Sequence, residues 1–215
     1  MEFIKELRLK LLFLKFVKDP TKTDLIFRIS DLGRDLKRNV ALIAEIEQRI
    51  LEDRVFKEAW DEKWIPATPS LEELAGYPLG SLGRAYFEHL EKNHLKINFF
   101  PAMKPTRVID YLSYRLYHAH DLWHVLLGYP VTPQGEIEVQ AFTLAQIKSP
   151  TSVMLMTGGF LNLLDKNPNL TPGIFESAVA AYHRGAASNF LLGLRLEEML
   201  GESIERVSNK AGLAK

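Results

Sequence analysis

The stretch TRVIDYLSYRLYHAHDLWHVLLGYP, residues 106–130, decides the fold. Its apolar residues recur at steps of three and four, which is the period of one face of an α-helix. The members of this stripe are Val108, Leu112, Leu116, Ala119, Trp123 and Leu126. Gly128 and Pro130 then interrupt the pattern, and both residue types commonly follow the last turn of a helix. The spacing predicts a long helix from about Thr106 to Leu127.

Helical periodicity also dominates the rest of the chain. A capping box at Ser70–Glu73 marks one helix start, and neither a hairpin nor an internal repeat is present. The further helices are expected over residues 1–18, 25–32, 39–56, 85–90, 136–147, 153–164 and 174–192, with an amphipathic stretch around Met199, Ile204 and Val207. Because 215 residues suit one domain, we expect residues 1–215 to form a single compact all-α domain.

The composition narrows the class of protein. Lysine plus arginine and aspartate plus glutamate both number 27, so the formal net charge is zero and nothing suggests a nucleic-acid partner. The chain has no cysteine, which excludes disulfides and thiolate metal sites. Any metal site has to use histidine and carboxylate ligands.

Residues 1–18 combine apolar side chains with frequent lysines. The lysines interrupt the apolar run too often for a secretory signal, and Glu2 and Glu6 argue against a mitochondrial transit peptide. We interpret the segment as the first core helix. The alternatives are an interfacial helix that lies on a membrane or a helix that binds a partner protein.

Four candidate metal ligands lie within seventeen positions. His120 and His124 stand one turn apart on the predicted helix, and Asp121 shares a wedge of roughly 100° with them. Glu136 begins the next predicted helix after a loop rich in proline and glycine. If that helix folds back antiparallel to the first, Glu136 comes level with His124. The spacing predicts a metal site between two antiparallel helices, whereas His118 and Glu138 are interpreted as solvated or outer residues.

The ligand types indicate the kind of metal. The two carboxylates balance a divalent charge, and the two imidazoles are neutral. Nitrogen ligands favour Zn, Fe, Mn or Co over Mg, although Mg stays a possible ion. A tetrahedral zinc would be saturated and structural. An ion with five or six ligands would keep positions open for water or substrate.

The metal motif and its surroundings resemble the Coq4 family of ubiquinone biosynthesis proteins. The family's signature is similar to the His-Asp-x-x-His sequence of residues 120–124, followed by eleven intervening residues and Glu136. Other stretches that resemble family landmarks are 19–21, 80–84, 114–115, 126–130, 135–137 and the layout of 196–213.

The resemblance implies a function. Family members are all-helical and carry a divalent metal, here on His120, Asp121, His124 and Glu136, which would also be the catalytic residues. They are associated with homodimers, with membrane surfaces and with other quinone biosynthesis proteins, and are credited with replacing the C1 carboxylate of the prenylated precursor by hydroxyl. Without a mitochondrial extension the chain looks like a bacterial version, expected in the cytoplasm on the inner face of the membrane, where the quinone need not be ubiquinone.

Two further sets of residues suit a prenylated ligand. Met154, Met156, Gly158 and Gly159 form an adaptable apolar segment, and small residues at 178–186 could leave a groove for an isoprenoid tail. The alternative interpretation is close packing between helices around these small residues. Arg84, Arg115 and Lys148 are candidate lipid-head-group or anion contacts, with solvated surface positions as the alternative.

Three functions compete. The chain is either a metal-dependent enzyme of prenylquinone synthesis, a non-catalytic lipid-binding scaffold of a quinone biosynthesis complex, or an HD-type metal-dependent phosphohydrolase. The last would use His94 and Asp165 as further ligands, and it leaves His124 and Glu136 without a role.

Overall fold

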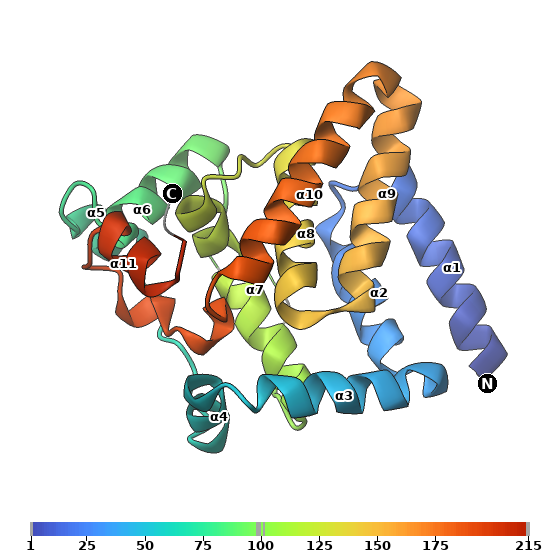
Figure 1. Cartoon of the computed structure of the whole chain (residues 1–215), viewed down its shortest axis with the longest axis horizontal. Coiled ribbons are helices and arrows are strands. Elements are labelled where there is room, and N and C mark those ends of the chain that lie inside the picture. Colours follow the sequence, from blue (N-terminus) through green and yellow to red (C-terminus); the bar gives the residue numbers. More distant parts are fainter. Residues whose placement is uncertain (1, 98–99, 101, 214–215) are drawn as a thin grey trace. The chain divides into compact units, whose positions relative to one another are not determined.

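The computed structural model describes residues 2–97, 100 and 102–213, and helices form almost all of its regular structure (Figure 1). Over these residues no strand forms, and one isolated β-bridge pairs Ser81 with Ser203. The prediction of an all-α fold is confirmed. No helix in the described part of the chain has both the length and the apolar character needed to cross a bilayer.

The helices group into two compact units, each made from two separate stretches of the chain. The first unit comprises Met1–Arg49 and Thr132–Ala186, and the second comprises Ile50–Val131 and Ala187–Lys215. The expected single domain over residues 1–215 stays a prediction. So does the antiparallel pairing of the two helices that carry the predicted metal ligands, because these helices belong to different units.

The first unit is a layer of helices in which α9 lies between α1 and α8 (Figure 1). Its helices are α1 (Glu2–Lys18), α2 (Thr23–Arg34), α3 (Val40–Ile50), α8 (Pro133–Ile147), α9 (Pro150–Lys166) and α10 (Thr171–Ala187), with the 3-10 turns η1 (Lys37–Asn39) and η2 (Pro168–Leu170). Leu9, Leu12 and Phe16 of α1 pack with residues of α2 and with Leu155 of α9 in one apolar cluster. Gly158 permits this packing, because a β-carbon there would lie 2.6 Å from the Phe16 ring.

The second unit is built around α7 (Val108–Leu127). It also contains α4 (Arg54–Asp61), α5 (Leu71–Gly76), α6 (Leu82–Asn93), α11 (Ile204–Lys210) and the 3-10 turns η3 (Leu191–Gly193) and η4 (Leu196–Glu198). Trp123 and Leu122 of α7 are buried in the core. The predicted end of this helix is confirmed, because Gly128 adopts φ of 74° and its N–H bonds to the His124 carbonyl.

Several predicted boundaries were wrong. The expected helix over 39–56 is divided, because the Asp53 carboxylate accepts the N–H of Phe56 and starts α4 as a separate helix. The helix expected from Glu136 begins at Pro133, where the Thr132 hydroxyl caps the N–H of Gly135. The helix expected to reach residue 192 ends at Ala187.

Candidate metal site

Three of the four predicted metal ligands lie on one side of α7, near its C-terminal end. His124 is 2% exposed and Asp121 is 8% exposed, while His120 is half-buried. Their positions follow from the helical repeat, which places residues three and four apart on the same face. The three residues are therefore buried or half-buried, as the helical pattern predicted, and their role as metal ligands stays a prediction.

The hydrogen bonding of His124 defines which of its nitrogens can bind a metal. Its Nδ1 lies 2.9 Å from the carbonyl oxygen of Tyr129. A carbonyl oxygen can only accept, so Nδ1 carries the proton and donates it. The neutral ring then has its lone pair on Nε2, which lies 3.3 Å from Nε2 of His120. A backbone carbonyl that orients a histidine in this way is typical of metal ligands.

The distance between the two Nε2 atoms suits a metal ion. With metal–nitrogen bonds of about 2.1 Å, a separation of 3.3 Å corresponds to a ligand–metal–ligand angle of about 100°. That angle is compatible with tetrahedral zinc and with adjacent positions of an octahedral ion. The residues present fit a divalent metal.

Asp121 lies on α7 between the two histidines in sequence and is 8% exposed. Its negative charge raises the pKa of the Tyr86 phenol. Its carboxylate oxygens do not lie within 4.8 Å of the ligand nitrogens of both His120 and His124 in the described part of the chain. The role of Asp121 as a metal ligand stays a prediction.

Glu136 lies in the first turn of α8, in the first unit, and is half-buried. Its place relative to the two histidines stays a prediction from the short connection between α7 and α8. Glu138, which was interpreted as solvated or outer, is 7% exposed and accepts a hydrogen bond from Gln134 at 2.8 Å.

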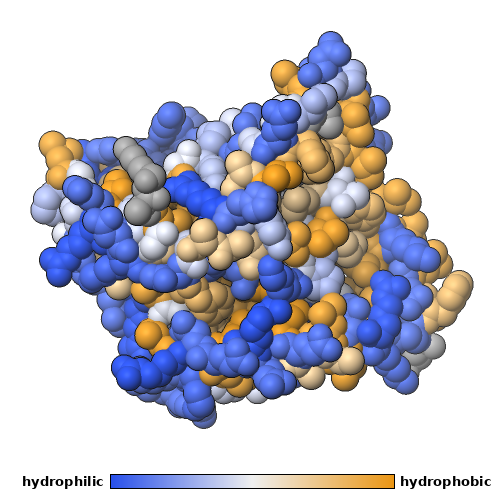
Figure 2. Space-filling view, in the orientation of Figure 1, coloured by the Kyte–Doolittle hydropathy of each residue, from blue (hydrophilic) through white to orange (hydrophobic). Residues whose placement is uncertain are grey.

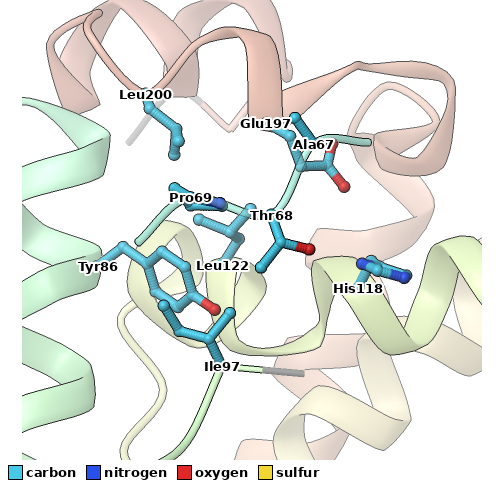
Figure 3. Close-up of a pocket in the computed structure, with 9 residues that line it drawn as sticks. All are labelled: Ala67, Thr68, Pro69, Tyr86, Ile97, His118, Leu122, Glu197 and Leu200. Atoms are coloured by element: carbon cyan, nitrogen blue, oxygen red, sulfur yellow. The ribbon is translucent and has the colours of Figure 1, made fainter. Parts of the chain in front are cut away.

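A small pocket of the second unit lies against α6 and α7 (Figure 3). Tyr86 of α6 projects into it, together with His118 and Leu122 of α7. The other lining residues are Ala67, Thr68, Pro69, Ile97, Glu197 and Leu200. The pocket is therefore mostly apolar with a few polar groups, as small-molecule sites commonly are.

Two polar groups of this pocket, Tyr86 and His118, are held in their neutral forms, whereas Glu197 is ion-paired with Arg115. Burial raises the pKa of the Tyr86 phenol, and the charges of Asp121 and Glu197 raise it further. Burial lowers the pKa of His118 to about 4, and the nearby Arg115 guanidinium acts in the same direction. Near neutral pH the pocket thus presents a phenol O–H and an uncharged imidazole, which suit a neutral polar group of a ligand.

The three predicted cationic contacts all have protein partners. Arg115 is 1% exposed and forms two hydrogen bonds with Glu197, at 2.6 and 3.2 Å. Arg84 donates to Glu88 and to the carbonyl of Ala75. Lys148 donates to the Tyr182 hydroxyl at 2.9 Å. Their role as anion contacts stays a prediction. A bound anion would have to compete with these protein partners for the three cationic side chains.

The predicted lipid segment lies on α9 in the first unit. Met154 packs beside the apolar cluster of α1 and α2, and Met156 is half-buried. A β-carbon at Gly158 would meet Phe16, and one at Gly159 would lie 2.9 Å from the Ile137 side chain. The glycines thus serve close helix packing in this structure, and lipid binding by the segment stays a prediction.

Sequence reasoning missed two residues of α6, Tyr86 and His89. They are three positions apart and so share a face of the helix. Tyr86 lines the pocket, and the His89 ring stacks on that of His124 with centroids 5.8 Å apart and 24° between the planes. The pattern of residues 85–90 is typical of an ordinary amphipathic helix. The one sequence signal for a site here was a tyrosine and a histidine at a spacing of three, which share a helix face.

Comparisons with known proteins agree on one family. The model of the family described as "Coenzyme Q (ubiquinone) biosynthesis protein Coq4" matches residues 13–215. The mitochondrial ubiquinone biosynthesis protein COQ4 of Yarrowia lipolytica is 26% identical over 80% of this chain and 66% of its own length. The homologue of Homo sapiens is 29% identical over 68% of this chain and 56% of its own, and that of Mycosarcoma maydis is 30% identical over 56% of this chain and 33% of its own. The chain thus spans between one third and two thirds of these relatives.

A solved structure has the same fold. It is a crystal structure at 2.85 Å resolution of a protein from Nostoc punctiforme that is assigned provisionally to ubiquinone biosynthesis. The TM-score is 0.83, the sequence identity is 22%, and the alignment covers 96% of this chain and 97% of the other. This likeness confirms the all-α fold.

Proposed function

Because the chain belongs to the Coq4 family of coenzyme Q (ubiquinone) biosynthesis proteins, we propose that it binds a divalent metal and acts on a prenylated precursor in quinone biosynthesis. His120, Asp121 and His124 would hold the metal, with Glu136 as the fourth ligand. Its relatives are named for ubiquinone biosynthesis. That this chain takes part in making ubiquinone or a related prenylquinone belongs to the proposal.

The pair of facing Nε2 atoms on α7 carries the metal proposal. His124 is already oriented by the Tyr129 carbonyl, and its Nε2 lies 3.3 Å from that of His120. Asp121, buried on the same helix, would supply negative charge. Imidazole and carboxylate ligands favour Zn, Fe, Mn or Co, with Mg as the weaker candidate.

The residues around the metal have separable tasks. The metal, when bound, would polarise a carboxylate or phenolic oxygen of the ring. The Tyr86 phenol, kept protonated by burial, would donate a hydrogen bond to a ring oxygen. The apolar wall formed by Leu122 and Leu200 would contact the ring and exclude water. His118, kept uncharged, would add an acceptor or a donor without repelling the metal.

The reaction we propose is the oxidative removal of the C1 carboxylate from the prenylated ring. Carbon dioxide leaves and a hydroxyl takes its place, which removes two electrons from the substrate. The reaction therefore requires an oxidant such as dioxygen. The test is turnover of a prenylated hydroxybenzoate by metal-loaded protein under air, with His120→Ala as the inactive comparison.

A non-catalytic scaffold is the second candidate. The same metal and pocket would then only hold the precursor for partner enzymes. Binding of the prenylated acid without product, in the presence of metal and dioxygen, would favour the scaffold and contradict the enzyme.

The HD-type phosphohydrolase has less support. Its further ligands would be His94, which ends α6 in the left-handed conformation, and Asp165 on α9, and both side chains are exposed. If His94→Ala and Asp165→Ala keep full metal content, the phosphohydrolase is excluded.

Metal content is the most direct measurement of the main proposal. Native mass spectrometry with elemental analysis and lipid extraction would report the ion, a homodimer and any bound isoprenoid together. We expect about one metal per chain, and loss of the metal in His120→Ala and His124→Ala. Protein that stays empty of Zn, Fe, Mn, Co and Mg on titration would contradict the proposal.

We also propose that α1 lies on an anionic lipid surface, as peripheral contact on the cytoplasmic face of a membrane. Leu9, Leu12 and Phe16 bury one face of this helix in the first unit. The opposite face is apolar as well, with exposed side chains at Phe3, Ile4, Leu7, Leu11 and Leu14. Figure 2 shows orange apolar side chains beside blue ones where α1 lies.

Cations border the exposed stripe of α1. At about 100° per residue, Lys10 falls on one side of it, and Arg8 and Lys15 fall on the other. All three are exposed, and none forms an ion pair with another described residue. The acidic residues point elsewhere: Glu2 accepts the backbone N–H of Lys37, and Glu6 pairs with Arg38. An apolar stripe between cations is the pattern of helices that lie in the interface of anionic bilayers.

Vesicle sedimentation tests this contact. We expect the chain to sediment with vesicles that contain phosphatidylglycerol and to do so several-fold less with pure phosphatidylcholine. Leu7→Ser with Leu11→Ser should reduce binding to both, whereas Val40→Ser, at a more exposed apolar position on α3, should not. Equal binding by the α1 variant and the control would contradict the proposal.

A further inference from the structure

His89 lies against a metal ligand but outside the signature that carries the four proposed ligands. It is on α6, which packs along α7 within the second unit. The 5.8 Å between its ring centroid and that of His124 is within the range of offset-stacked aromatic pairs. The ring of His124 also meets His120 edge-on, with centroids 4.9 Å apart and 83° between the planes.

Packing against a face of the His124 ring controls how far its plane can tilt. Nδ1 donates to the Tyr129 carbonyl, and Nε2 lies 3.3 Å from Nε2 of His120. The lone pair of Nε2 lies in the ring plane, so a tilt turns it away from His120. A ring packed against the face of His124 restricts the tilt.

We propose that His89 is a positioning residue of the metal site, whose ring stacks on His124 and holds Nε2 toward Nε2 of His120. This inference rests on the proposed metal site. It predicts that the aromatic ring matters, and that the nitrogens of residue 89 do not. Outer residues that orient a ligand typically change metal affinity by about 10- to 100-fold, and a stacked pair accounts for the lower end of that range.

The variants separate orientation from ligation and from folding. His89→Ala removes the ring, and His89→Phe keeps a ring without nitrogens. His183→Ala is the control, because this histidine is exposed on α10 in the first unit. In a titration of the metal-free full chain with Co²⁺ alone, followed by visible absorption, we expect His89→Ala to bind about tenfold more weakly. His89→Phe should stay within about threefold of the wild type, and His183→Ala should match it.

A second readout needs no metal. Long-range ¹H–¹⁵N NMR of the metal-free protein at one fixed pH reports which nitrogen of His124 carries the proton. We expect the Nδ1–H form in the wild type and in His89→Phe, and a mixture of both forms in His89→Ala.

The two readouts also separate this inference from the proposed function. A wild-type chain that does not bind Co²⁺ would contradict the metal site, while the NMR spectrum would still decide whether His89 orients His124. Wild-type affinity in His89→Ala, or an unchanged His124 spectrum in that variant, would overturn the inference. So would weak binding by His89→Phe equal to that of His89→Ala, because the nitrogens of His89 would then be what matters.

Discussion

Removal of Glu197 should destabilise the protein strongly, because it leaves a buried guanidinium without its counter-ion. Arg115 is 1% exposed, and its two terminal nitrogens donate to Glu197 at 2.6 and 3.2 Å. Its other contacts are the Leu194 carbonyl at 3.2 Å and the ring of Trp64, 4.5 Å from the guanidinium carbon. Breaking a buried pair from one side costs about 3–5 kcal/mol. In a chain of this size, that corresponds to a melting temperature lower by roughly 6–20 °C.

Urea unfolding of metal-free protein, followed by circular dichroism, measures this cost. The control is Lys57→Ala, which removes an ion pair with Asp61 whose two side chains are more than half exposed, and it should cost less than about 1 kcal/mol. The double variant Arg115→Met with Glu197→Leu should be more stable than Glu197→Ala, since no charge stays buried. A cost below about 1 kcal/mol for Glu197→Ala, or a double variant of lower stability still, would refute the reasoning.

Three further outcomes follow from local contacts. Asp53→Ala removes the cap of α4 and should lower the unfolding free energy by about 1 kcal/mol in denaturant titrations; no change would mean that α4 starts without it. Gly158→Ala forces a side chain against the α1 core and should cost about 1–3 kcal/mol, whereas Gly173→Ala, with open space around it, should be neutral or stabilising in the same assay. The Ser70 N–H lowers the pKa of Glu73 in the folded chain. The ionised carboxylate therefore stabilises the fold above its ordinary pKa, and this stabilisation is lost as the pH falls through the lowered pKa. A carboxyl ¹³C NMR titration midpoint at or above 4.5 would contradict this.

The residues of α7 were the most predictable part of the chain. The repeat that runs to Trp123 and Leu126, and the glycine at 128, are both local signals, and the structure has the helix and its end where they indicated. The ligand wedge of His120, Asp121 and His124 followed from the same repeat.

Helix starts set by side-chain caps were harder to predict. Asp53 and Thr132 each begin a helix by accepting a backbone N–H. The periodicity of apolar residues continues across Asp53, and at Pro133 it begins later than the helix does. A cap is a single polar contact, so it leaves little trace in a pattern of many residues.

Contacts between distant residues could not be predicted from one sequence. Arg115 was expected to be an anion contact or a solvated surface side chain, but it is buried against Glu197, which is 82 residues away. His89 likewise meets His124 only because α6 packs on α7. Helical spacing determines on which face of its own helix a residue lies. Which residues of another helix pack against that face depends on the packing of the whole unit.

The interleaved order of the two units has a consequence for synthesis on the ribosome. Residues 1–49 leave the ribosome first, but α8, α9 and α10 of the same unit follow only after Thr132. At about 5–20 residues per second, the early helices wait for roughly 4–16 s. During that time α1 and α2 can pair with each other, yet Leu155, the α9 member of their apolar cluster, has not been made. The inner apolar face of α1 therefore stays partly uncovered until α9 is made, in addition to the outer face with Leu7 and Leu11 that stays exposed in the folded chain.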